Sequence, residues 1–158
     1  MSKVLISACL LGAKVRYDGR DNLLEHPILK EWHRQGRLVT VCPESQGGLP
    51  TPRPPAETQT RFPILVTTRE GEDVTPQFLH GAEKTLELAQ KHDCCCALMK
   101  ARSPSCGNQE IYDGSFSGQL ISAPGIAAGE LIRNGIPVFN EHQMDELIRF
   151  VEQRIQAA

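Results

Sequence analysis

Short apolar runs alternate with amphipathic helical patterns along this chain, and this alternation is the strongest constraint on its fold. The strand-like runs are Lys3–Cys9, Leu38–Cys42, Ile64–Thr68, Cys94–Met99 and Pro137–Asn140. The helical patterns are Asn22–Gln35, Thr75–Lys91, Pro124–Asn134 and Glu141–Gln156. Strands that alternate with helices favour a parallel sheet covered on both faces. The sequence therefore predicts a three-layer, Rossmann-like α/β fold with an open, mostly parallel sheet.

Two long segments without a clear helical or strand pattern interrupt this alternation. Residues 43–63 and 100–122 are rich in Gly, Pro and Ser and read as loops. Loops of this length inside a compact domain are usually functional. The strand Ile64–Thr68 is expected to pair with a short segment near Asp73–Val74. The length of 158 residues is that of one ordinary domain, so we expect residues 1–158 to form a single domain.

The charge balance limits the classes of partner. The net charge is -2, which gives no broad electrostatic attraction to nucleic acid or to an anionic membrane. The apolar run Val4–Leu11 is too short to span a bilayer and lacks the pattern of a signal peptide. We therefore expect a cytoplasmic protein, a monomer or small homo-oligomer, with reduced thiols and a small-molecule ligand.

Three of the six cysteines fall at or beyond the ends of predicted strands. Cys9 ends the first strand, Cys42 ends the second, and Cys106 lies in the loop after Cys94–Met99. Ligands of an open parallel sheet bind outside the carboxyl ends of its strands, so these thiols are expected to converge there. Three thiolates suit an iron–sulfur cluster or zinc.

A fourth protein ligand is not evident from the sequence. The histidines lie on predicted helices or at their ends: His26, His33, His80, His92 and His142. None of them neighbours a cysteine in the loops concerned. A metal centre here is therefore expected to keep one open position, where a substrate could bind a Lewis-acidic metal.

The remaining cysteines, Cys94, Cys95 and Cys96, open the third core strand. Free cysteine is among the most buried residue types, so they are expected to be small core residues. Adjacent side chains of a strand point to opposite faces, which disfavours a thiol redox pair at these positions.

Polar residues close to the three convergent cysteines are candidates for catalysis. Glu44 follows Cys42 by two residues and could act as a general acid or base. Ser103 and Ser105 flank Cys106 in the segment SPSCG and could donate hydrogen bonds to sulfur or to a substrate.

Basic and aromatic residues of the same loops are candidates for binding a substrate. Lys100 and Arg102 stand at the end of the third strand, where an anionic group would be favoured. Arg16 and Arg53 add positive charge from other loops, and Tyr17 could stack on a base ring.

Four segments, in this order, resemble the thiouracil desulfurase (TudS-like) family: SACLLGAKVRYDG, VCPESQGGLPTPRPPAE, KARSPSCG and IYDGSFSG. The resemblance runs from Ser7 to about Gly118, and the remaining helices suit the same domain. It implies a 4Fe-4S cluster held by three cysteines, which map to Cys9, Cys42 and Cys106, with one open iron.

The same resemblance implies a non-redox desulfuration of a thiopyrimidine to the oxo-pyrimidine and hydrogen sulfide. The family's catalytic glutamate maps to Glu44, and its catalytic serine falls within SPSCG, where we favour Ser103 over Ser105. Expected substrates are 2-thiouracil, thiouridine and 4-thiouridine monophosphate. The local positive charge favours the monophosphate.

Two other hypotheses stay open at this point. One is a zinc- or cluster-binding module without catalysis, in which Glu44 would serve no chemical purpose. The other is a thiol redox enzyme that uses adjacent cysteines such as Cys95 and Cys96. The absence of a CxxC motif disfavours the second hypothesis.

Overall fold

The computed structural model describes residues 2–157, with side chains described as far as Arg154. Its centre is a four-stranded parallel sheet with the strand order β2-β1-β5-β8. The strands are β1 (Lys3–Ser7), β2 (Leu38–Val41), β5 (Cys94–Leu98) and β8 (Val138–Phe139). Their apolar residues face a layer on each side, which explains why β1 and β5 are almost wholly buried.

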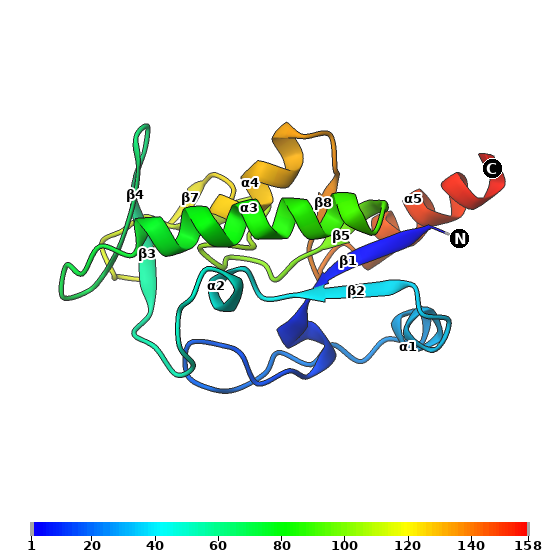
Figure 1. Cartoon of the computed structure of the whole chain (residues 1–158), viewed down its shortest axis with the longest axis horizontal. Helices are drawn as coiled ribbons and strands as arrows, with labels where there is room; N and C mark the ends of the chain where they lie inside the picture. The colour runs from blue at the N-terminus through cyan, green and yellow to red at the C-terminus, as the bar shows by residue number, and fades with distance from the viewer. Residues whose placement is uncertain (1, 158) are drawn as a thin grey trace.

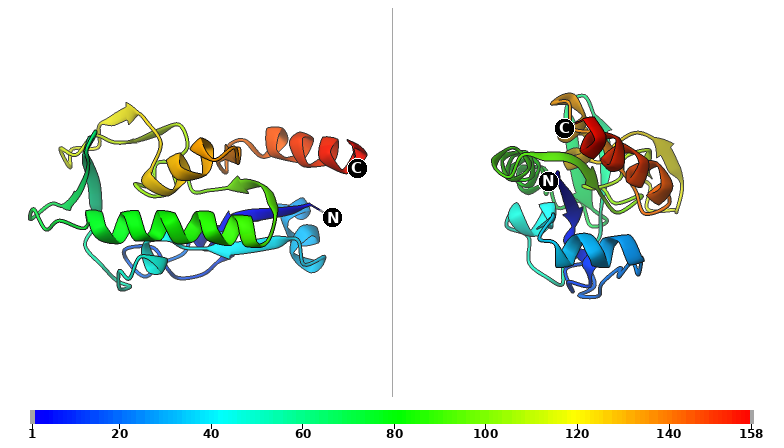
Figure 2. Two further views of the ribbon diagram at one scale, coloured as in Figure 1. Left: turned by 45° about the horizontal axis from the view of Figure 1, so that its top comes forward. Right: turned by 90° about the vertical axis from the view of Figure 1, so that its right-hand side faces the viewer.

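Helices cover both faces of this sheet (Figures 1 and 2). On one face, Leu29 and Trp32 of α1 (Pro27–Arg34) and Leu147 of α5 (Met144–Ala157) join the core around β1 and β5. On the other face, Ala89 of α3 (Thr75–Lys91) and Leu131 of α4 (Ile126–Arg133) pack on the same strands. The predicted three-layer α/β fold with a parallel sheet is confirmed.

Both long loops contain structure that the sequence did not predict. The first holds α2 (Pro43–Gln46) and β3 (Ala56–Arg61), which pairs in antiparallel fashion with β4 (Ile64–Thr68). The second holds the antiparallel pair β6 (Glu110–Tyr112) and β7 (Leu120–Ser122). The predicted pairing of β4 with residues 73–74 is confirmed as one isolated bridge, Thr67 with Asp73, and as the hydrogen bond from Val74 N–H to the Val66 carbonyl, whereas the main partner, β3, was not predicted.

Several predicted boundaries move by a few residues, and the largest shift is at the start of the first helix. The first helix starts at Pro27 rather than Asn22, because His26 caps it by accepting the N–H of Ile28 at Nδ1 (3.2 Å). The last helix starts at Met144 rather than Glu141. The residues after Ser7 leave the sheet as a short 3-10 helix, η1 (Ala8–Leu11), which carries Cys9.

A close contact between backbones fixes α2 against α3. A Cβ atom added to Gly47 would stand 1.9 Å from the carbonyl oxygen of Gln77, and one added to Gly81 would stand 1.9 Å from that of Pro43. Only glycine fits at either position. The contact places the first turn of α2, which follows Cys42, directly over α3.

The three adjacent cysteines do not alternate as the sequence suggested. The register between β1 and β5 shifts at the start of β5, where Lys3 faces Cys94 and Val4 faces Cys96. This irregularity puts Cys94 in the core on the α3 face, while Cys96 and Cys95 both lie on the α1 face. The expectation that neighbouring thiols point apart is therefore wrong for Cys95 and Cys96, whose Sγ atoms are 3.8 Å apart.

No helix within residues 2–157 is long and apolar enough to cross a membrane.

Candidate active site

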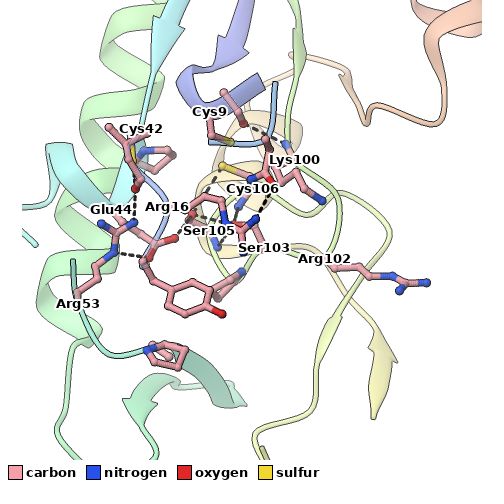
Figure 3. Close-up of a pocket in the computed structure, with 18 of the residues that line it drawn as sticks. Cys9, Arg16, Cys42, Glu44, Arg53, Lys100, Arg102, Ser103, Ser105 and Cys106 are labelled. Carbon is pink, nitrogen blue, oxygen red and sulfur yellow. Dashed lines mark hydrogen bonds and ion pairs between the residues drawn. The ribbon is translucent and has the colours of Figure 1, made fainter. Parts of the chain in front are cut away.

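The carboxyl ends of the parallel strands open into a cavity of about 650 Å³, and the three predicted cysteines line it (Figure 3). Cys9 comes from η1 after β1, Cys42 precedes α2 after β2, and Cys106 follows β5. Cys9 and Cys42 are half-buried and Cys106 is buried. The expected convergence of these residues on one edge of the sheet is thus what the structure shows.

Burial dominates the protonation of two of these thiols. Burial raises the pKa of Cys9, although the Asn22 side chain opposes the shift. Burial likewise raises the pKa of Cys106 to about 12, against hydrogen bonds from Ser7 and Ser105. Uncharged, buried thiols of this kind become thiolates when a cation binds them, because coordination displaces the proton.

The three thiols share the cavity without forming a site for one ion. Among residues 2–157, no three His, Cys, Asp or Glu side chains lie close enough together to hold a single metal ion. Cysteine thiolates bind both zinc and iron–sulfur clusters, so the donor set by itself admits either group.

Glu44 lies in the first turn of α2 and is held from two sides. Its Oε1 accepts a hydrogen bond from Nε of Arg53 at 3.1 Å, and its Oε2 accepts one from Oγ of Ser105 at 2.8 Å. The side chain of Arg53 is 5% exposed and that of Glu44 is 15% exposed. The carboxylate is thus fixed in a largely dry position beside the cysteines.

The two serines of SPSCG form a chain of hydroxyl groups that ends on Glu44. The Oγ atoms of Ser103 and Ser105 are 3.1 Å apart. The Ser103 hydroxyl also accepts the backbone N–H groups of Ser105 (3.2 Å) and Cys106 (3.0 Å), which fixes its position. Because Ser105 donates to Glu44, its oxygen is free to accept the proton of Ser103. A proton can therefore pass between the cavity and Glu44 along this chain.

Each of the four predicted cations has a carboxylate partner. The pairs are Arg16–Asp18 (3.1 Å), Arg53–Glu44 (3.1 Å), Lys100–Glu141 (2.7 Å) and Arg102–Glu110 (3.1 Å). The guanidinium of Arg102 points away from the cysteines (Figure 3). Arg53 also donates hydrogen bonds to the carbonyl oxygens of Pro50 and Val15 and to the hydroxyl of Thr51. The positive charge at the cysteine end of the cavity is therefore largely neutralised.

Sequence reasoning missed Glu141, which follows β8. Its Oε2 pairs with Lys100 and its Oε1 accepts the N–H of Ala101 at 2.7 Å. Burial alone would raise the pKa of Glu141, but these two partners more than offset that effect and lower the pKa. Glu141 thus fixes the backbone and the lysine at the end of β5.

A second missed group lies on the antiparallel strand pairs that face the cysteines across the cavity. Arg69 follows β4, and its guanidinium stacks 5.5 Å from the ring centre of Phe116. No carboxylate lies within ion-pair distance of Arg69 in the described part of the chain. Glu57 fixes the loop of Phe116 by accepting its N–H (3.1 Å) and that of Gly114 (3.0 Å). No local motif marks Arg69, because its place depends on how the two hairpins fold over the sheet.

The fold and the cavity define an α/β protein with three cysteines and an acid–hydroxyl chain at the carboxyl edge of a parallel sheet. The family model of 2-thiouracil desulfurase matches residues 4–143, and the chain belongs to this family. The resemblance read from the four sequence segments is thereby confirmed.

Two similar proteins cover nearly the whole chain. The uncharacterized protein YbbK of Bacillus subtilis (strain 168) is 36% identical over 152 residues, which are 92% of this chain and 99% of that protein. The solved structure of the [4Fe-4S]-dependent thiouracil desulfidase TudS is 43% identical, with a TM-score of 0.93 over 97% of this chain and 99% of that one.

Proposed function

We propose that this protein removes sulfur from a thiopyrimidine in a non-redox reaction, in which water oxygen replaces the sulfur and hydrogen sulfide leaves. The observation that carries this proposal is the meeting of Cys9, Cys42 and Cys106 with Glu44 in one cavity. Membership of the 2-thiouracil desulfurase family and the similarity to TudS support it.

Cys9, Cys42 and Cys106 would hold a 4Fe-4S cluster and leave its fourth iron open. The donor set fits, because iron–sulfur clusters are bound by cysteine thiolates and these three thiols line one cavity. Such a cluster supplies a soft Lewis-acidic iron, which prefers the sulfur of a thiocarbonyl over oxygen.

Side chains of the protein would activate the attacking water and transfer the protons. Glu44 accepts a proton from the attacking water, and the hydroxyls of Ser105 and Ser103 return protons toward the departing sulfide. Ser103 carries the more exposed hydroxyl, and Ser105 is the buried link to Glu44. Arg53 is a positioning residue, since its buried guanidinium holds the carboxylate.

The substrate would be a thiouridine monophosphate, with 4-thiouridine monophosphate as the first compound to test. A cavity of about 650 Å³ has room for a nucleotide, and Tyr17 on its wall offers a ring that could stack on the pyrimidine. Arg69, which also lines the cavity, has its charge available for a phosphate, unlike Arg16, Lys100 and Arg102.

Anaerobic purification with iron and sulfide analysis tests the cluster. We expect a brown protein with about four irons and four sulfides per chain, which converts the thiopyrimidine and releases sulfide. A colourless protein that contains zinc after anaerobic purification would contradict the proposal.

Turnover of 2-thiouracil, 4-thiouridine and 4-thiouridine monophosphate tests the substrate. We expect the highest kcat/KM for the monophosphate. Arg69→Gln should raise KM for the monophosphate by about 10- to 100-fold, the value of one charge-assisted hydrogen bond, and should leave the nucleoside unchanged. Arg102→Gln is the matched control and should change neither. Equal efficiency on all three compounds would exclude phosphate recognition.

A further inference from the structure

A second pair of thiols lies at the opposite edge of the sheet, where β5 begins. Cys95 and Cys96 occupy the start of this strand, whereas Cys9, Cys42 and Cys106 lie beyond the other ends of the strands. The chain's N-terminus and the last helix, α5, lie at this edge (Figures 1 and 2). The pair therefore takes no part in the proposed desulfuration.

The shifted register of β5 turns the two sulfurs toward each other. Their Sγ atoms are 3.8 Å apart and share a hydrogen bond. Cys96 is fully buried, while Cys95 is partly exposed and gives access to the pair. Sharing this hydrogen bond, with the charge of Arg154 nearby, lowers the pKa of Cys95 to about 7 and raises that of Cys96. The thiolate, which is the reactive form, is therefore more easily formed at Cys95 than at Cys96.

This separation suits two sulfurs on a shared atom better than a disulfide. Two sulfurs at about 2.3 Å from a shared atom stand about 3.3–3.8 Å apart for bond angles of about 90–110°. A disulfide needs an S–S distance of about 2.05 Å and Cα atoms at least about 4.4 Å apart, whereas neighbouring residues have Cα atoms about 3.8 Å apart. Closing a disulfide here would strain the start of β5.

The pair supplies two thiol ligands, and this number limits the kind of centre that it can hold. In the part of the chain that the structure describes, no third His, Cys, Asp or Glu joins the pair at metal-binding distance. Cys94 packs on the other face of the sheet. Binding of zinc or iron is therefore disfavoured at this pair, because these metals require more protein ligands. A trivalent arsenic atom with one organic substituent has two valences left, and two thiolates satisfy both.

We propose that Cys95 and Cys96 form a thiol site that captures monoorganic trivalent arsenicals as a cyclic dithioarsenite. Two As–S bonds form, the arsenic–oxygen bond of the arsenoxide breaks, and the two thiol protons leave with that oxygen as water. The arsenic stays trivalent, so the step needs no oxidant or reductant. Cys95 attacks first from the exposed side, and Cys96 closes the ring.

The test is alkylation of the full-length protein by iodoacetamide with and without one equivalent of phenylarsine oxide, read by peptide mapping of residues 92–100. We expect the arsenical to slow the labelling of Cys95 at least tenfold. A dithiol such as 2,3-dimercaptopropanol should restore the labelling, and a monothiol should not. Mapping this peptide separates the pair from any reaction at Cys9, Cys42 or Cys106.

Two variants separate chelation by the pair from simple reaction at one thiol. Cys96→Ala should make the protection of Cys95 reversible by a monothiol, because one As–S bond no longer closes the ring. Cys94→Ala is the matched control and should behave as the unaltered protein. Unchanged labelling of Cys95 in the unaltered protein, or protection that survives Cys96→Ala with the same resistance to monothiols, would overturn the proposal.

Discussion

At the scale of single residues, the carboxylate of Glu44 is held at both of its oxygens. Arg53 holds one of its oxygens and Ser105 holds the other. A carboxylate fixed in this way has its charge and its orientation set before a substrate arrives, so little reorganisation is needed during the reaction. Removing the charge of Glu44 should therefore slow the chemical step and lower kcat.

We expect Glu44→Gln to lower kcat for the thiopyrimidine by about 10²- to 10⁴-fold, the usual contribution of a general acid or base. The glutamine keeps the shape and can still accept from Arg53, so KM and the iron content should change little. Glu110→Gln, which removes an exposed carboxylate paired with Arg102, is the control. Unaltered kcat in Glu44→Gln would show that Glu44 takes no part in the chemical step.

Glu141 gives a pH-dependent prediction of a different kind. Its pKa in the folded protein is lowered, so its contribution to stability is present above the ordinary carboxyl value of about 4.5 and is lost as the pH falls through the lowered value. Glu141→Gln should reduce the free energy of unfolding by about 1.5–3 kcal/mol at pH 7. Urea unfolding should show this difference shrinking between pH 5 and pH 3, and a constant difference would contradict the assignment.

At the scale of elements, the contact between α2 and α3 determines where Cys42 and Glu44 stand. The backbones touch through Gly47 and Gly81, so neither helix can move along the other without a clash. The short α2 has four residues and little stability of its own. Its position depends on the much longer α3.

Gly81→Ala should therefore harm both stability and activity. Alanine favours a helix by about 1 kcal/mol over glycine, but its Cβ would stand 1.9 Å from the carbonyl oxygen of Pro43. Overpacking of this kind costs about 1–3 kcal/mol. We expect a lower melting temperature and a kcat that falls with it, as α2 is displaced. Glu83→Ala, at an exposed position of α3, should leave kcat unchanged.

What the sequence could predict at this scale follows from local patterns. The sequence predicted that Cys9, Cys42 and Cys106 meet at one edge of the sheet. Each of them lies at or after the end of a strand, and parallel strands all end at the same edge. The strand β3 was missed because its residues, AETQTR, are mostly polar and show no strand pattern. They form a strand through their pairing with β4. The pairing of Cys95 with Cys96 was missed because a register shift depends on the neighbouring strand.

At the scale of the whole molecule, the three cysteines come from three segments of the chain that lie far apart in the sequence. Cys9 and Cys42 flank α1, and α3 and β5 intervene before Cys106. A group bound by all three sulfurs would join these segments, and its binding energy would be available only in the folded state.

Loading with iron and sulfide should therefore raise the melting temperature of the protein. The increase should be largely absent in Cys9→Ala and present in Cys94→Ala, which removes a thiol outside the cavity. Calorimetry of stripped and reconstituted protein measures the effect. An equal increase in both variants would place the bound iron elsewhere.

The loop that carries Ser103, Ser105 and Cys106 also closes the first turn of α4. Ile126 donates its N–H to the carbonyl of Pro104 (3.0 Å), and Ala127 and Ala128 donate theirs to the carbonyl of Ser105 (2.9 and 3.0 Å). These amides cannot meet solvent unless the loop lifts away. In deuterated water, exchange at residues 126–128 would thus report on opening of this loop, and a ligand that steadies the loop should slow the exchange of all three together.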